Sequence, residues 1–189
     1  MADVPLTVWT IGHSTRSAAE LVELLGQARV DLLVDVRSVP RSRMNPQFNG
    51  ELLPSTLAAS GIGYRHLPAL GGLRAARKDG LPSPNKLWRN TGFRNYADYA
   101  AASPDFRQGL AELAALACSN RCAIMCAEAV WWRCHRRIVS DYLLTAGVAV
   151  AHIMGPGKIE PATLTPGAEP LADGSILYPS ASGSQLSLL

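Results

Sequence analysis

The segment that decides the fold reads Cys122-Ala-Ile-Met-Cys-Ala-Glu-Ala-Val-Trp-Trp-Arg-Cys-His-Arg-Arg-Ile-Val-Ser-Asp-Tyr-Leu-Leu144. Its first apolar run is short and ends abruptly at a thiol and a carboxylate, which predicts a buried strand over residues 121–127. Its last part predicts a helix over residues 134–146, which Gly147 ends. The junction gathers reactive and cationic side chains beside the unpaired N–H groups and the positive dipole end of a helix. Such a junction is suited to binding an anion.

The same alternation of strand and helix runs through the chain. Further strands are predicted over residues 6–11, 32–37, 62–67 and 148–153, and further helices over residues 17–28, 52–60, 96–102 and 103–117. This order predicts a three-layer α/β fold with a mainly parallel sheet of about five strands and helices on both faces. We expect a single domain over residues 1–189. Its last part, residues 155–189, is rich in Gly, Pro, Ser and Ala and is expected to be an irregular C-terminal tail.

The composition is typical of a globular protein, since 48% of the residues are hydrophobic and 17% are charged. No apolar stretch approaches the roughly 20 residues of a membrane span, so we expect no membrane association. The first residues contain neither a basic nor a hydrophobic signal-peptide region, which argues against secretion. The four cysteines lie within residues 118–134, where their spacing suits neither a dispersed disulfide framework nor paired zinc knuckles. These features together predict a cytoplasmic protein.

Ionisable side chains mark the ends of four predicted strands. They are His13, Asp35 with Arg37, His66, and Cys126 with Glu128. Because ligands of parallel α/β sheets bind beyond the carboxyl ends of the strands, we expect these side chains to form one site. Gly12 is expected to let a ligand approach the backbone there.

Most of the eighteen basic residues are arginine, and only three are lysine. The arginines cluster within residues 37–43, 74–77 and 133–137. A planar guanidinium matches phosphate and carboxylate groups. We therefore expect the partner to be an anionic small molecule, such as a nucleotide, or a nucleic acid. The oligomeric state is not predicted by any feature of the sequence.

Several short motifs occur in a characteristic order. They are Ile11-Gly-His-Ser14, Val34-Asp-Val-Arg37, Tyr64-Arg-His-Leu-Pro68 with Leu70-Gly-Gly72, Tyr96-Ala-Asp98, Cys126-Ala-Glu128 and Cys134-His-Arg136. Each motif is weak alone, but the ordered set resembles the bacterial family called domain of unknown function 488 (DUF488), over about residues 6–180. The resemblance implies a small cytoplasmic α/β protein and does not imply a particular activity.

The Cys134-His135-Arg136 motif has three interpretations. Cys134 can be a nucleophile activated by the helix end and His135. Alternatively, His135 and Arg136 bind an anion while Cys134 packs in the core. In the third, Cys126, Cys134 and His135 bind zinc with one further ligand. The spacing matches no standard zinc pattern, so we prefer the second and expect neither a metal site nor a cofactor.

The remaining candidates also have structural alternatives. Cys126 can be an inert core thiol. Glu128 ends an apolar strand and is expected to need a partner, Arg37 or Arg136. Asp35 and Arg37 share a strand face, as an internal ion pair or as a pair that binds a ligand.

The site hypothesis assigns two sets of residues. The catalytic set consists of Glu128, which moves a proton together with His13 or Asp35, and Cys126 as a secondary candidate. The anion-binding set is Arg37, Arg43, His66, Cys134, His135 and Arg136. The expected function is an enzyme, a hydrolase or group transferase, acting on a phosphate-bearing or otherwise anionic substrate. The alternatives are a non-catalytic nucleotide- or nucleic-acid-binding module, with Trp131 and Trp132 stacking on bases, and a structural protein.

Overall fold

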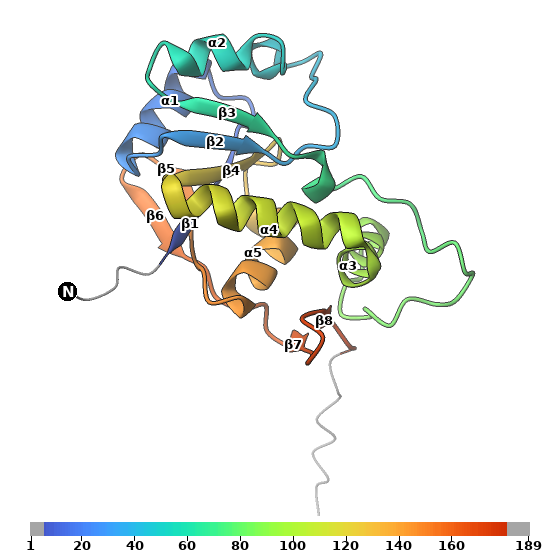
Figure 1. Cartoon of the computed structure of the whole chain (residues 1–189). Helices are drawn as coiled ribbons and strands as arrows, with labels where there is room; N and C mark the ends of the chain where they lie inside the picture. Colours follow the sequence, from blue (N-terminus) through green and yellow to red (C-terminus); the bar gives the residue numbers. More distant parts are fainter. Residues whose placement is uncertain (1–5, 181–189) are drawn as a thin grey trace, which may run out of the picture.

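The apolar run before Cys126 forms the central strand β4 (Cys122–Cys126), in which every residue is buried. β4 pairs in parallel with two strands, one on each side. Figure 1 shows the computed structural model, which describes residues 6–180. A strand that is buried on both faces and has parallel neighbours needs helices above and below it.

The main sheet has six strands in the order β3-β2-β4-β1-β5-β6. They are β1 (Thr7–Gly12), β2 (Leu32–Asp35), β3 (Gly63–His66), β4, β5 (Ala149–Gly155) and β6 (Lys158–Pro161). All neighbours are parallel except β5 and β6, which are antiparallel. The predicted three-layer, mainly parallel fold is therefore confirmed, with six strands instead of about five.

Two hydrophobic clusters hold the helices against opposite faces of the sheet. One face carries α1 (Ala18–Gln27) and α2 (Leu53–Ala58), and the other carries α3 (Thr91–Ala102), α4 (Pro104–Ser119) and α5 (Arg136–Thr145) (Figure 1). Short 3₁₀ turns occupy Pro46–Phe48, Pro68–Leu70 and Trp131–Arg133. Because successive strand residues point to opposite faces, Ile124 packs with α3–α5 while Ala123 and Met125 pack with α1 and α2.

Local signals in the sequence start two of the helices as expected. Ser17 and Glu20 form a reciprocal capping box at α1. Ser103 caps α4, with Pro104 in its first turn. α3 begins at Thr91, before the predicted start at residue 96, because Asn90 accepts a hydrogen bond from the backbone of Gly92 at 2.8 Å.

The C-terminal part is more regular than expected. Residues 155–178 contain β6 and a small sheet of β7 (Glu169–Pro170) and β8 (Ile176–Leu177). This segment is therefore not wholly irregular as predicted, because its short strands tolerate Pro161 and Pro170 at their last positions. Tyr178 is fully buried, and its hydroxyl donates to Asp141 Oδ2 of α5 at 2.9 Å. The rest of the predicted tail, residues 181–189, lies outside the described residues.

Tyr178→Phe should lower the free energy of unfolding by about 1–3 kcal/mol, because it removes a donor from the buried carboxylate of Asp141. Urea unfolding at neutral pH measures this loss. Tyr99→Phe is the matched control, since the Tyr99 hydroxyl donates only to the backbone carbonyl of Ala69. An equal or smaller loss for Tyr178→Phe would contradict the role given to the Asp141 contact.

Candidate functional site

A pocket with a volume of about 440 Å³ lies beyond the carboxyl ends of β1, β2 and β4. The register of the sheet brings these ends together, since Gly12 pairs with Cys126 and Asp35 with Met125. The chemically active side chains on the pocket wall are His13, Arg37, Ser38, Arg41, Ser42, Tyr96, Cys126, Glu128, Arg133, Cys134 and His135. Four of the six residues expected at the strand ends, His13, Arg37, Cys126 and Glu128, therefore line one pocket at this edge of the sheet.

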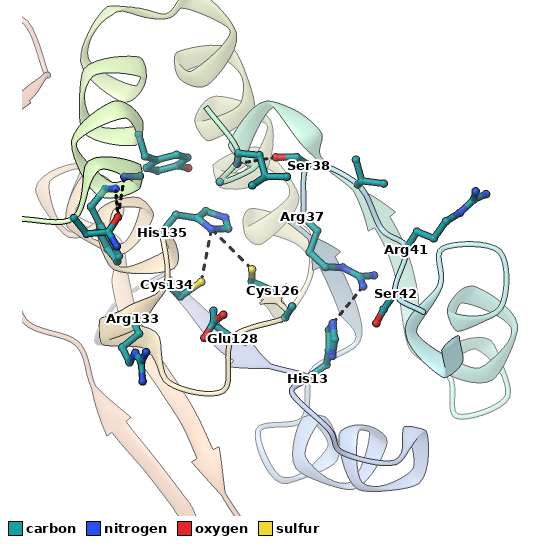
Figure 2. Close-up of a pocket in the computed structure, with 18 residues that line it drawn as sticks. His13, Arg37, Ser38, Arg41, Ser42, Cys126, Glu128, Arg133, Cys134 and His135 are labelled. Carbon is teal, nitrogen blue, oxygen red and sulfur yellow. Dashed lines mark hydrogen bonds between the residues drawn. The ribbon is translucent and has the colours of Figure 1, made fainter. Parts of the chain in front are cut away.

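Two thiols and one imidazole meet at the centre of the pocket wall (Figure 2). His135 Nδ1 lies 3.7 Å from Cys134 Sγ and 3.9 Å from Cys126 Sγ. His135 Nε2 lies 3.1 Å from the carbonyl oxygen of Val36, which can only accept, so Nε2 carries a hydrogen. Nδ1 is consequently the ring nitrogen that can exchange a proton or form a hydrogen bond with the two sulfurs. These three side chains are the ones in residues 6–180 that are grouped closely enough to hold a metal ion.

Arg136 lies beneath this cluster and is only 1% exposed. Its Nη2 donates to the backbone oxygen of Glu128 at 2.6 Å, and its Nε donates to Cys134 Sγ at 3.3 Å. No carboxylate within the described residues forms an ion pair with it. A buried guanidinium requires a compensating negative charge, and Cys134 is the group in position to supply it.

The two thiols have opposite pKa shifts. Burial raises the pKa of Cys134, but the hydrogen bond with Cys126 and the charges of His135 and Arg136 outweigh it and hold that pKa well below its usual value. The hydrogen bond with Cys134, together with burial, raises the pKa of Cys126 well above its usual value. These opposite directions mean that Cys134 loses its proton more readily than Cys126.

Asp35 and Arg37 form an internal ion pair, the first of the two alternatives for these residues. Arg37 Nη2 lies 2.5 Å from Asp35 Oδ2, and the carboxylate also accepts from the Tyr64 hydroxyl at 2.8 Å. Asp35 is fully buried and does not line the pocket. Arg37 does line it, and its Nη1 faces His13 Nε2 at 3.3 Å.

His13 lines the pocket, but both of its ring nitrogens are already engaged. Nδ1 lies 2.9 Å from the Ser14 carbonyl oxygen, and Nε2 faces Arg37. The ring stacks on Phe48 with centroids 4.3 Å apart. Burial lowers the pKa of His13 to about 4, so the ring is neutral at pH 7. These contacts make His13 a positioning partner for Arg37 and leave it poorly placed to take a proton from a ligand.

Glu128 does not have the expected ion pair. β4 ends at Cys126, so the alternation that was expected to place both side chains on one strand face does not extend to residue 128. Arg136 binds the backbone oxygen of Glu128 instead of its carboxylate. The side chain of Glu128 is exposed on the pocket wall, so it does not need the partner that a buried carboxylate would require.

Four of the expected site residues do not line the pocket. One is the buried Asp35 described above, and the others are Arg43, His66 and Arg136. Arg43 is exposed in the loop that follows β2. The ring of His66 is directed to the carbonyl oxygen of Arg37, with Nε2 at 2.8 Å. Arg136 acts from below, through Cys134 and the backbone of residue 128.

The sequence interpretation assigned no role to Arg41, Arg133, Ser38 or Tyr96, which the structure places on the pocket wall. The two arginines belong to the clusters seen in the sequence, so their neighbours provided a signal. Tyr96 belongs to one of the ordered motifs, but a tyrosine within a predicted helix is more typical of the core, so it was assigned no role in the site. Its ring centroid lies 5.0 Å from that of His135, and its hydroxyl donates to the Leu70 oxygen.

The chain is a small α/β protein with a pocket beyond the carboxyl ends of a mainly parallel sheet. Residues 17–143 match the family model described as domain of unknown function DUF488. The chain therefore belongs to this family, as the ordered motifs indicated. No curated protein and no solved structure matches the chain. Within residues 6–180, no helix has the length and apolarity required to span a membrane.

Proposed function

We propose that this protein is an enzyme, a hydrolase or group transferase, that acts on a phosphate-bearing or otherwise anionic small molecule bound in the pocket. The observation that carries the proposal is the convergence of Arg37, Arg41 and Arg133 on a pocket that also contains the Cys134–His135 pair. Glu128 is the sole carboxylate on that wall among the described residues. The excess of guanidinium groups favours an anion.

The three arginines support the proposal in different ways. Arg37 lines the pocket and is held by Asp35, with Nη1 facing His13, so its guanidinium is fixed in position for an anionic oxygen. Arg133 is exposed, and no carboxylate within residues 6–180 forms an ion pair with it. Arg41 pairs with Glu51 at 2.8 Å on the surface, an interaction that a ligand phosphate can replace at little cost.

Glu128 is the best-placed general acid or base in this proposal. Its carboxylate is exposed on the wall beside the thiol and imidazole cluster (Figure 2). Asp35 is occupied by Arg37 and Tyr64, and His13 by Arg37 and Ser14. Glu128 would accept the proton of an attacking water or hydroxyl group and return it to the leaving group.

Glu128→Gln should leave ligand binding nearly unchanged and reduce turnover by about 10²-fold or more. Suitable probes are nucleoside mono-, di- and triphosphates and inorganic pyrophosphate, with binding followed by calorimetry and turnover by product release.

Arg133→Gln should weaken binding of these probes and make their affinity less dependent on salt concentration, because one charge contact is lost. Arg29→Gln is the matched control, since Arg29 is exposed before β2, at the opposite edge of the sheet.

The competing function is a non-catalytic nucleotide- or nucleic-acid-binding module. Trp132 is 45% exposed and available for stacking, but Trp131 already stacks on His152, with centroids 4.4 Å apart. Neither tryptophan lines the pocket. Salt-dependent binding without turnover, in both the wild type and Glu128→Gln, would favour the non-catalytic binding module and contradict the enzyme proposal.

A further inference from the structure

The thiol and imidazole cluster has the composition and geometry of a metal site. We propose that Cys126, Cys134 and His135 bind a divalent metal ion of the zinc type, with its fourth coordination position open to the pocket. The inference deepens the proposed function and rests on it for the role of the ion, but the binding of metal stands on the geometry alone.

The distances between the donor atoms fit one shared ion. The donor atoms of the three side chains all lie within 4.8 Å of one another. The two sulfurs lie 3.7 and 3.9 Å from His135 Nδ1. With Zn–S of about 2.3 Å and Zn–N of about 2.0 Å, sulfur and nitrogen ligands of a tetrahedral zinc are about 3.6 Å apart. Only a small contraction would therefore bring the three donors onto an ion.

The groups around the donors are those that orient metal ligands. His135 directs its Nε2–H to the carbonyl oxygen of Val36 at 3.1 Å, which aims the Nδ1 atom at the sulfurs. Gly72 packs against the same ring, and a Cβ added there would lie 2.8 Å from His135 Cγ. The imidazole is therefore fixed both in tautomer and in position.

The position of Arg136 also fits a metal site. A thiolate bound to a metal ion still accepts hydrogen bonds, so it attracts a nearby donor. Arg136 Nε donates to Cys134 Sγ at 3.3 Å from a fully buried position. Two inert core thiols would not compensate a buried guanidinium.

The number of protein ligands assigns the type of site. Structural zinc sites have four protein ligands, whereas catalytic ones have three and leave a position for water or substrate. Within residues 6–180, no fourth Cys, His, Asp or Glu joins the cluster, and all three ligands line the pocket. An ion here would polarise an anionic substrate or lower the pKa of a bound water beside Glu128.

Titration of the metal-free, fully reduced protein with Co(II) and then Zn(II) tests the proposal directly. We expect one Co(II) ion per chain, with sulfur-to-cobalt charge-transfer and tetrahedral d–d absorption bands that Zn(II) abolishes. Cys126→Ser, Cys134→Ser and His135→Gln should each weaken Co(II) binding by more than ~100-fold, beyond the loss caused by groups that only orient a ligand. Cys118→Ser is the matched control, because Cys118 is exposed and lies outside the cluster.

The outcomes separate the metal site from the proposed function. Absence of the thiolate bands in the folded wild-type protein would overturn the metal site, whether or not the protein turns over a substrate. Formation of a Cys126–Cys134 disulfide in air, with no metal binding in reductant, would overturn it in favour of a redox dithiol. Metal binding with the expected variant pattern but without turnover of any phosphate probe would uphold the site and contradict the enzyme proposal alone.

Discussion

Gly12→Ala is expected to lower the free energy of unfolding by about 3 kcal/mol or more, the upper end for inserting a methyl group into a close-packed interior. A Cβ at Gly12 would overlap the backbone oxygen of Glu128 and lie 2.7 Å from its carbonyl carbon and 2.9 Å from Ala129 Cα. These are backbone atoms, so no side-chain rotation can relieve the overlap. The expectation that a ligand approaches Gly12 was wrong, because the chain's own backbone occupies that space.

The same substitution should disturb the pocket. The backbone of His13 donates to Cys126 O at 2.9 Å, and Arg136 holds the oxygen of Glu128 that the methyl group would displace. If Gly12→Ala loses Co(II) binding as well as stability, the metal site and the stability of the fold are coupled through this contact. Urea unfolding measures the stability, with Gly26→Ala as the control.

Gly26 lies within α1, and a Cβ added there meets no atom within 4 Å. Gly26→Ala should therefore raise stability by up to about 1 kcal/mol through helix propensity. Equal effects of the two substitutions would show that the backbone of residue 128 can yield, and the packing argument for Gly12 would fail.

Acidification from pH 7 to pH 4 is expected to remove about 3 kcal/mol of stability through His152 alone. His152 is 2% exposed in β5, stacks on Trp131, and shares a 2.8 Å hydrogen bond with Thr10. Burial, with a smaller effect of the positive charge of Arg136, lowers the pKa of His152 from 6.5 to about 4. Between these values the unfolded chain binds a proton that the folded protein excludes, so stability falls as the pH falls. Below pH 4 both states are protonated and the loss through His152 levels off.

His152→Gln removes the titrating group, and the difference between the two proteins isolates its contribution. Stability from urea unfolding at a series of pH values should decline less steeply for the variant, so that the two curves converge toward pH 4. Curves that remain parallel from pH 7 to pH 4 would show that His152 does not titrate in this window.

Local patterns in the sequence predicted most of the helices and strands. The capping box at Ser17, the proline after Ser103 and the apolar runs before Asp35 and Cys126 each act over a few residues, so they can be recognised without tertiary structure. The errors arose where distant contacts decide. Tyr178 orders the C-terminal segment through Asp141, which lies 37 positions earlier, and no local pattern reveals that contact.

The sequence predicted at which edge of the sheet the candidate site lies, but not how its side chains pair with one another. The rule that ligands bind beyond strand ends grouped six ionisable residues. Of these, His13, Arg37, Cys126 and Glu128 line one pocket, whereas Asp35 and His66 do not. The rule could not tell which residues were already paired. The Asp35–Arg37 ion pair and the contact of Arg136 with the backbone of residue 128 depend on side-chain directions that only packing sets.

The sequence by itself determined the parallel α/β sheet, the family, and the edge of the sheet at which the ionisable residues gather. These follow from hydrophobic periodicity and from the order of motifs along the chain. Only the tertiary structure decided that Cys126, Cys134 and His135 converge around His135 Nδ1, with Val36 and Arg136 behind them. The sequence offered this group as one of three interpretations but could not select it, because its members are joined by a loop whose path is set by the packing of β4 and α5.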